Sequence, residues 1–469
     1  GLVGSEMCIR DSKKLEAENR LALPEEQEVL SKYVGWGALP MAFDEGKEDW
    51  TAEYAELKEL LTPEEYAAAR ASTLNAHYTS PVVIQAMYSA LESFGFKTGN
   101  ILEPACGTGN FFGMLPDEMR QSKLYGVELD PVTGRIARQL YQTANIAIQG
   151  FEDTNLPESF FDVAIGNVPF GDYSVSDRKY DKEHMLIHDY FIAKSLDKVR
   201  PGGIVAFVTS SGTLDKQNPA ARRFIAKRAE LVGAIRLPNN AFQKNAGTSV
   251  VTDILFLQKR DRPIEIEPEW VHLGKTDDGY TINQYFIDNP QMILGTLTTE
   301  STQYGRQETT VAPIEGEDLA DQLRDAFSNI HTDIVISDEE LDPEEDNIET
   351  IPADPSVRNY SFTLHEGDVY FREDSVMKKV DVPQTALSRI RGMIELRDSV
   401  RKVIQYQLEG YSDEVVRDEQ KRLNALYDSF TQRYGLLSSR ANKNAFAGDS
   451  SYSLLSSLEI IGEEGELLK

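Results

Sequence analysis

Cysteine is nearly absent from this chain, whose 469 residues include only Cys8 and Cys106. Two isolated cysteines in unlike contexts build neither a disulfide framework nor a cluster of metal ligands, so we expect no metal site. No apolar run approaches the roughly 18–20 residues that span a bilayer, and no basic stretch followed by an apolar one opens the chain. We therefore expect a soluble, cytoplasmic protein without a membrane partner.

Positive charge is also scarce, because 48 lysines and arginines face 77 aspartates and glutamates, which gives a formal net charge of −29. Such an excess argues against a nucleic-acid partner, whose phosphates attract lysine and arginine. The acidic excess is unevenly distributed, however, since residues 75–262 contain 21 basic and 20 acidic residues. This central region stays compatible with a nucleic-acid substrate, whereas the flanks are acidic.

Two nucleotide-binding signatures are missing. No G-x-x-x-x-G-K-[ST] sequence occurs, which argues against a nucleoside triphosphatase. The glycine pair Gly107 and Gly109 is followed three residues later by Phe112, so the third glycine of a dinucleotide-binding G-x-G-x-x-G is absent as well. The chain also contains no internal repeat.

Short apolar segments alternate with amphipathic ones from Asn75 onward. Strands are expected at 101–103, 124–128, 147–149, 163–165, 204–209 and 231–236, and helices at 81–94, 132–143, 189–199 and 220–229. This alternation is typical of an α/β fold, here a Rossmann-like, doubly wound and mostly parallel sheet of six or seven strands. We expect residues 252–258 to pair antiparallel at the sheet edge.

Composition and periodicity divide the chain into six segments. We expect residues 1–12 outside the fold, a helical N-terminal segment 13–74, the α/β domain 75–262, an accessory α/β region 263–332, an acidic linker 333–358 and a largely helical C-terminal region 359–469.

The segment after the first expected strand has the composition of a ligand-binding loop. It reads Glu103-Pro104-Ala105-Cys106-Gly107-Thr108-Gly109-Asn110-Phe111 and leads into a helix. The glycines allow a tight turn and a close approach to a ligand, and the helix N-terminus offers N–H groups to a carboxylate. About twenty residues later, Glu128 ends the second strand, where a doubly wound fold binds a ribose diol. An adenosine-containing ligand is predicted, with an acidic turn residue as the alternative.

The fourth expected strand runs into Asn167-Val168-Pro169-Phe170. An exocyclic amine conjugated to a ring is a poor nucleophile, so a site that alkylates it needs acceptors for its N–H hydrogens. The Asn167 side-chain oxygen and the Val168 carbonyl can accept them, and Pro169 fixes the backbone angle. Phe170 would stack on a planar substrate. The alternative is a loop that merely closes a strand.

These motifs resemble those of adenine-N6 DNA methyltransferases. Glu103–Phe111 is similar to their D-P-A-C-G-T-G-N-F cofactor loop, and Asn167–Phe170 is similar to their [DNS]-P-P-[YF] catalytic tetrad. Tyr78-Thr79, inside His77–Pro81, resembles their Y-T-P element in the gamma-type order. Roughly from Glu25 to Arg262, the chain looks like the methylase portion of large helicase-methylase proteins of conjugative elements and phages. Two positions depart from the pattern, since Glu103 replaces an aspartate and Val168 replaces the first proline.

The resemblance implies an S-adenosylmethionine-dependent DNA methyltransferase that acts on adenine N6. By position, the cofactor-binding residues would be Tyr78, Thr79, Glu103, Pro104, Ala105, Gly107, Gly109, Asn110, Phe111, Glu128 and Glu152. The catalytic residues would be Asn167, Val168, Pro169 and Phe170. DNA would be the partner, together with downstream helicase domains of the same polypeptide. Because no ATPase signature occurs, we expect that this chain either stops before those domains or lacks them.

Two other functions stay open at the level of sequence. The same tetrad handles any planar amine, so the acceptor could be a glutamine amide of a protein or an amine of RNA. A non-catalytic module that binds the cofactor or DNA within a mobile-element protein is the second alternative, although such a module needs neither the glycine loop nor Asn167.

Two weaker signals have competing interpretations. Trp36, between two glycines, would either stack on a base or pack in the protein interior. A short basic helix would either contact phosphates or form a solvated face; its cations are Arg222, Arg223, Lys227 and Arg228.

Overall fold

The computed structural model describes residues 2–37, 40–73, 78–242, 251–301, 307–334, 349–374, 376–461 and 467–468. Most of the acidic linker expected at 333–358 lies outside these residues, as does His77. The chain divides into two compact units, residues 1–154 with 161–336 and residues 155–160 with 337–469. Within the described part of the chain, no helix combines the length and apolarity needed to cross a bilayer.

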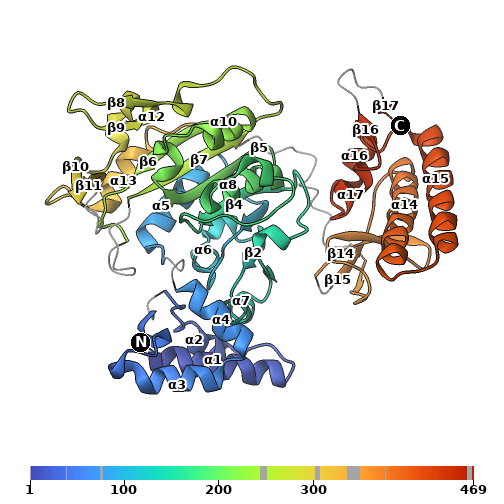
Figure 1. Cartoon of the computed structure of the whole chain (residues 1–469), viewed down its shortest axis with the longest axis horizontal. Coiled ribbons are helices and arrows are strands. Elements are labelled where there is room, and N and C mark those ends of the chain that lie inside the picture. The colour runs from blue at the N-terminus through green and yellow to red at the C-terminus, as the bar shows by residue number, and fades with distance from the viewer. Residues whose placement is uncertain are drawn as a thin grey trace. The chain divides into compact units, whose positions relative to one another are not determined.

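A seven-stranded sheet with the order β3-β2-β1-β4-β5-β7-β6 forms the centre of the first unit (Figure 1). Its strands are β1 Asn100–Glu103, β2 Lys123–Glu128, β3 Asn145–Ile148, β4 Phe161–Asn167, β5 Val199–Ser210, β6 Ala229–Arg236 and β7 Thr252–Lys259. Strands β1 to β5 pair in parallel, and β7 runs antiparallel to both of its neighbours. The expected α/β fold with a mostly parallel sheet is confirmed.

The expectation that residues 252–258 pair at the sheet edge is wrong. Strand β7 lies between β5 and β6, and β6 is the edge strand. The physical reason is burial, since residues 252–257 are all buried, and a strand covered on both faces is typical of the interior of a sheet. Strand β6 carries the exposed Glu230, a charge that suits an edge.

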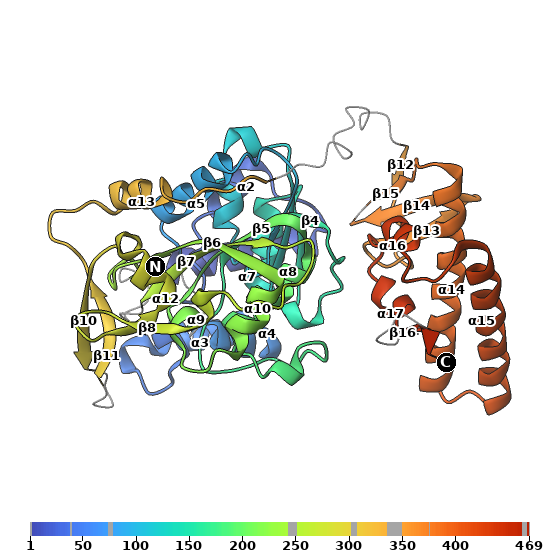
Figure 2. The same cartoon turned by 90° about the horizontal axis from the view of Figure 1, so that it is seen from above.

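Helices cover both faces of the sheet (Figure 2). Helices α5 Pro81–Ser93 and α13 Leu319–Phe327 pack together on one face, and α8 Ile187–Lys198 and α10 Ala220–Arg228 pack together on the other. The remaining elements of this part are α6 Asn110–Gly113, α7 Pro131–Leu140, α9 Gly212–Asp215, β8 Leu273–Lys275, β9 Thr281–Asn283, α12 Gln284–Asp288, β10 Thr296–Ser301 and β11 Gln307–Ala312.

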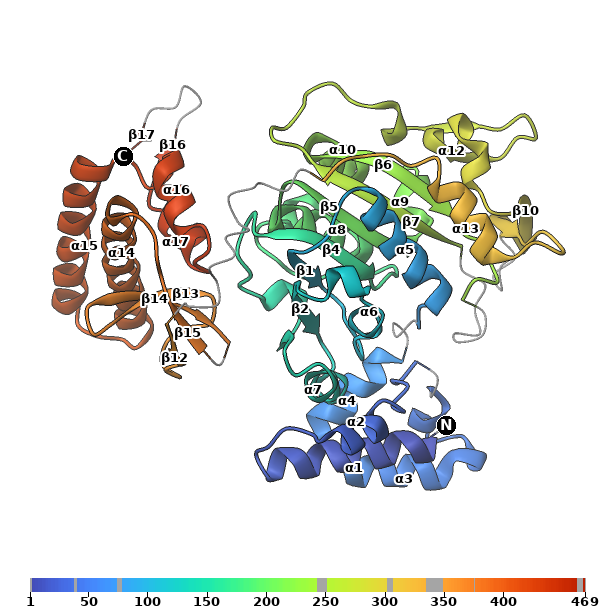
Figure 3. The same ribbon diagram turned by 180° about the vertical axis from the view of Figure 1, so that it is seen from behind.

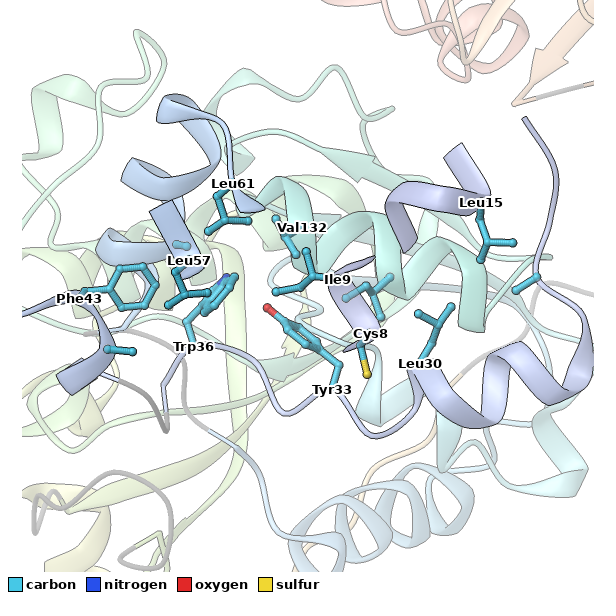
Figure 4. Packing of buried hydrophobic residues seen from close by; sticks show 14 residues of the cluster. Cys8, Ile9, Leu15, Leu30, Tyr33, Trp36, Phe43, Leu57, Leu61 and Val132 are labelled. Carbon is cyan, nitrogen blue, oxygen red and sulfur yellow. The ribbon is translucent and has the colours of Figure 1, made fainter. Parts of the chain in front are cut away.

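Four helices form what we call the N-terminal module, residues 2–73 (Figure 3). They are α1 Leu2–Ala17, α2 Pro24–Leu30, α3 Thr51–Leu60 and α4 Pro63–Ser72. Figure 4 shows Val132 of α7 beside Ile9 and Leu61, so the apolar core of the module includes a helix of the sheet domain. The expectation that residues 1–12 lie outside the fold is wrong, because Cys8 and Ile9 are buried in this core.

Polar contacts add to this attachment. The buried carboxylate of Glu65 in α4 accepts hydrogen bonds from Lys13 Nζ at 2.7 Å, from the Thr62 main-chain N–H at 2.9 Å, and from Arg135 of α7. At the other end of α7, the Gln139 side chain accepts a hydrogen bond from the Ala22 main-chain N–H at 2.8 Å. Hydrogen bonds therefore attach the N-terminal module to α7 at two points.

An ion triad of buried Arg236 and Asp253 with half-buried Asp215 connects β6 and β7 with the chain segments around them. Arg236 donates to both carboxylate oxygens of Asp253 at 2.8 Å and to Asp215 at 2.6 Å. Its guanidinium lies 4.4 Å from the centre of the Phe286 ring, and Asp215 also accepts the Asn283 main-chain N–H at 2.9 Å. These contacts join residues 281–288 to the sheet, and the paired charges offset the cost of burial.

The second unit combines a small antiparallel sheet with helices. Its elements are β12 Thr350–Pro352, β13 Ser361–His365, β14 Asp368–Glu373, β15 Val376–Lys379, α14 Gln384–Leu408, α15 Asp413–Tyr434, α16 Arg440–Phe446, α17 Tyr452–Ser456, β16 Ile460–Ile461 and β17 Leu467–Leu468. The four-stranded sheet, ordered β12-β15-β14-β13, was not expected from the sequence. Buried Arg397 pairs with Asp449 at 2.7 Å and joins α14 to the segment before α17.

Replacing Glu65 by glutamine should destabilise the protein. Glutamine has nearly the same shape as glutamate, but its amide is neutral and no longer pairs with the charges of Lys13 and Arg135. The free energy of unfolding should therefore fall by about 1–3 kcal/mol. Burial raises the pKa of Glu65, but the hydrogen bonds from Lys13, Thr62 and Arg135 lower it below its ordinary value overall. The stabilisation should therefore be present at neutral pH and be lost on acidification.

Urea denaturation of Glu65→Gln at neutral pH measures this effect. Glu64→Gln is the matched control, because Glu64 is the exposed neighbour on the same helix turn. Equal stability of the two variants would contradict the structural role of Glu65.

Candidate active site

The loop that leaves β1 turns on two left-handed glycines. Gly107 has a φ of 55° and Gly109 a φ of 85°, a region that side chains disfavour. The Gly109 N–H donates to the Cys106 carbonyl at 2.8 Å, which closes the turn before α6. A Cβ atom on Gly109 would lie 2.4 Å from the Tyr141 ring, so this position has no room for a side chain.

The Glu128 carboxylate, at the end of β2, is held from two sides by main-chain N–H groups. One oxygen accepts from Gly107 at 2.8 Å, and the other accepts from Asp130 at 2.8 Å. Burial raises the pKa of this carboxyl to about 7, although main-chain hydrogen bonds from Asp130, Gly107 and Leu129 oppose the rise. Each carboxylate oxygen has a second lone pair, so the group can still accept hydrogen bonds from a ligand.

Glu103, the last residue of β1, is buried at the same edge of the sheet. Its Oε2 has no hydrogen-bond partner among the described residues. Burial, and then the nearby Glu128 charge, raise the pKa of Glu103 well above its ordinary value. A Cβ atom on Gly166 would lie 3.2 Å from Glu103 Cγ, so β1 and β4 end in close contact here.

The amide of Asn167, at the end of β4, is fixed at its nitrogen. Asn167 Nδ2 donates to the buried Thr79 Oγ1 at 3.1 Å. Its oxygen, Oδ1, is buried and has no partner within the described part of the chain. Among these residues, the side chain therefore keeps an unused acceptor, which is what a substrate amine requires.

A main-chain hydrogen bond explains why valine fits at position 168, where the similar tetrad of adenine-N6 methyltransferases has proline. The main-chain N–H of Val168 donates to the Val208 carbonyl at 3.1 Å, which extends the pairing of β4 with β5 by one residue. Proline has no N–H and could not make this bond. The Val168 side chain is buried, and Pro169 and Phe170 are half-buried.

Sheet topology brings the predicted motifs to one edge. In the order β3-β2-β1-β4 all strands are parallel, so the segments after their carboxyl ends lie at the same edge. Glu103, Glu128 and Asn167 end three of these strands. Glu152 follows β3 and is half-buried, and its carbonyl accepts from Lys194 Nζ at 3.3 Å.

The other predicted cofactor residues differ in exposure. Pro104 and Phe111 are buried, and the Phe111 carbonyl accepts from Tyr88 Oη at 2.6 Å. Ala105 and Asn110 are half-buried, whereas Tyr78 is 44% exposed. A ligand at this edge can therefore cover the Tyr78 side chain, whereas Phe111 and Pro104 are enclosed by the protein itself.

Asp130 is a site residue that sequence reasoning missed. It is buried, it caps α7, and its N–H holds Glu128. The available signal was the Asp-Pro pair that opens α7, which is a common helix start. Trp36 packs in the interior and donates to Asp130, so the base-stacking interpretation is wrong for this state of the chain.

The phosphate-binding interpretation of the basic helix also finds no support. Arg222 is buried and donates to the Val271 carbonyl, and Arg228 stacks on the Phe224 ring. The two other cations pair with glutamates of the same chain: Arg223 with Glu267 at 2.6 Å and Lys227 with Glu265 at 3.6 Å.

Residues 59–277 match the family described as N-6 DNA Methylase. The chain is 29% identical over 221 residues to the Defense against restriction protein B of Escherichia phage P1, an alignment that covers 46% of this chain and 10% of that protein. It is 26% identical over 235 residues to the Type I restriction enzyme EcoEI methylase subunit of Escherichia coli, covering 43% of this chain and 45% of the subunit. The chain thus spans a tenth of the first relative and less than half of the second.

Two further proteins show similarity to this chain, one in sequence and one in structure. The rRNA N(6)-adenosine-methyltransferase metl-5 of Caenorhabditis elegans is 25% identical over 194 residues, which cover 39% of this chain and 86% of that protein. Among solved structures, the Type I restriction enzyme EcoKI M protein has 20% identity and a TM-score of 0.32, covering 55% of this chain and 61% of that protein.

Replacing Val168 by proline should lower the stability of the protein, even though the similar tetrad of the methyltransferases has proline at this position. The change leaves the Val208 carbonyl without its donor, which should lower the free energy of unfolding by about 1–3 kcal/mol. Thermal unfolding of Val168→Pro measures the loss. Val168→Ala is the control that keeps the N–H, and a proline variant no less stable than the alanine variant would contradict the assigned hydrogen bond.

Proposed function

We propose that the chain, whose residues 59–277 match the N-6 DNA methylase family, is an S-adenosylmethionine-dependent methyltransferase that acts on adenine N6 in DNA. The observation that carries the proposal is the position of two elements at one sheet edge. The glycine loop with Glu128 offers a place for an adenosine, and the buried Asn167 Oδ1 next to it offers an acceptor for an amine.

The residues at the edge fit this cofactor. The left-handed glycines keep side chains away from the loop backbone, and Glu128 accepts the ribose hydroxyls. The Oε2 of buried Glu103, which has no hydrogen-bond partner among the described residues, offers an acceptor for N–H groups of the ligand, and Glu152 would contact the adenine. When bound, S-adenosylmethionine supplies an electrophilic methyl group.

The target amine is held by the Asn167 tetrad. Asn167 Oδ1 and the Val168 carbonyl accept its two hydrogens, which directs the nitrogen lone pair away from the ring, and Phe170 stacks on the flipped base. Thr79 fixes the orientation of the amide by accepting from its nitrogen. Among the described residues, therefore, only the oxygen of the amide is left to meet a substrate hydrogen.

Methyl transfer proceeds without a covalent enzyme intermediate. The cysteine of the glycine loop, Cys106, is buried, and burial raises the pKa of its thiol well above the ordinary value, followed by the effect of the Glu103 charge. A protonated thiol is a poor nucleophile. The amine of the substrate itself is therefore the group that is methylated.

Adenine in RNA is the second candidate substrate. It is favoured by the similarity to a protein named as an rRNA N(6)-adenosine-methyltransferase, 86% of which is covered by the alignment. Parallel assays with DNA and RNA separate the two, because transfer to RNA alone would keep the enzyme class and overturn the DNA assignment.

Replacing Asn167 by alanine should abolish methyl transfer while sparing cofactor binding. Loss of one preorganised polar group at a reacting centre costs about 100- to 1000-fold in rate. Radiolabelled methyl transfer to DNA measures the rate, and calorimetry with S-adenosylhomocysteine measures binding. Asn155→Ala, at an exposed loop position, is the control and should be fully active. Full activity of Asn167→Ala would remove this residue from the mechanism.

The affinity for adenosine should depend on pH through Glu128. Because the pKa of this carboxyl is raised to about 7, the ionised form that accepts both ribose hydroxyls becomes dominant only above neutrality. Affinity should therefore rise up to about tenfold per pH unit below pH 7 and level off above it. Adenosine is the suitable ligand, since it has no group that titrates in this range.

The matched variant for this measurement is Glu128→Gln, whose side chain cannot ionise. Its affinity should stay constant between about pH 6 and 8. A pH-independent affinity in the unmodified chain would contradict a role of the Glu128 carboxylate in ribose binding.

A further inference from the structure

We infer that Trp36 of the N-terminal module is a positioning residue for the cofactor site, which acts on Glu128 through Asp130. The inference rests on the proposed function, because it assumes that Glu128 binds the ribose. Trp36 lies outside the segment 59–277 that matches the methylase family, so the match assigns it no role.

The first step is the fixed orientation of the indole. Trp36 is 1% exposed, and its ring meets Tyr33 and Phe43 edge to face at centroid distances of 5.9 and 5.4 Å (Figure 4). Its Nε1 donates to Asp130 Oδ2 at 2.8 Å. An indole packed on both sides cannot swing away, so its N–H holds the carboxylate in one place.

The second step is the position of Asp130 at the start of α7. The same Oδ2 accepts from the main-chain N–H of Thr133 at 2.9 Å and from the Thr133 hydroxyl, which forms a helix N-cap. Tyr33 Oη lies 3.1 Å from this hydroxyl, which adds a second contact from the module. Trp36 and Tyr33 thus stabilise one buried cap, whose conformation decides where the Asp130 N–H points.

The third step is the hydrogen bond from Asp130 to the Glu128 carboxylate, the group that would bind the ribose. The Asp130 N–H donates to Glu128 Oε1, while the glycine loop holds Oε2 through Gly107. Movement of the cap would release one side of the carboxylate and turn its remaining lone pairs away from the ribose. Trp36 is therefore connected to Glu128 by two successive hydrogen bonds, each 2.8 Å long.

The hydrogen bond from the indole indicates that Trp36 does more than fill space. An apolar residue would fill the same volume, but Asp130 is 1% exposed, and a buried carboxylate needs donors. Its other oxygen, Oδ1, has no hydrogen-bond partner within the described part of the chain. Loss of the indole N–H would thus remove one of the few donors that hold this charge, and the cap would shift to find another.

Calorimetric titration of Trp36→Phe with two ligands tests the inference. The ligands are S-adenosylhomocysteine and its 2′,3′-dideoxyribose analogue, which lacks both hydroxyls for Glu128. We expect Trp36→Phe to bind the parent ligand about tenfold more weakly but the dideoxy analogue as well as the unmodified chain does, because only the ribose contact depends on the Glu128 orientation. Trp50→Phe, at a partly buried tryptophan packed against the same core, is the matched control and should leave both affinities unchanged.

The outcomes separate the inference from the function on which it rests. Equal weakening for both ligands, or no weakening, would overturn the positioning role and leave the proposed function standing. If the unmodified chain bound neither ligand, the proposed function itself would fail. Should Trp36→Phe not fold, Asp130→Asn serves in its place; it should also lose the preference for the ribose, and a retained preference would overturn the inference.

Discussion

The Glu128 carboxylate connects the loop after β1 with the helix after β2. It accepts one N–H from the glycine loop and one from the cap of α7, so the loop after β1 and the helix after β2 share a single anchor. Because β2, β1 and β4 are parallel neighbours, Asn167 is carried to the same edge. The geometry that we assign to the cofactor and the target amine follows from this anchor and the strand order.

Burial of carboxyl groups gives the site its electrostatic character. Glu103 and Glu128 are acidic residues side by side in an environment that raises the pKa of both. A ligand with positive charge would offset this unfavourable arrangement, and S-adenosylmethionine carries a sulfonium and an ammonium group. The positive charge of the proposed cofactor would therefore favour the ionised form of both carboxyl groups.

Local patterns predicted most of the sheet and the place of the motifs, because each strand, loop and helix is encoded within a short window. Asn167, Glu103 and Glu128 could be placed at strand ends for this reason. The order of the last two strands could not be read from the sequence, since β7 and β6 are both apolar and only burial on both faces distinguishes them. The link from Trp36 to Asp130 was missed because it spans 94 positions.

The place of β7 between β5 and β6 has a consequence for synthesis on the ribosome. Strand β6 leaves the exit tunnel first but is joined to the sheet by β7, which follows it in the chain. Until β7 emerges, the apolar side chains of β6 are not covered by a neighbouring strand. Arg236 also lacks its ion-pair partner during this time, because Asp253 belongs to β7. The nascent chain can therefore complete this sheet only after β7 has left the tunnel, and until then β6 has no neighbouring strand to pair with.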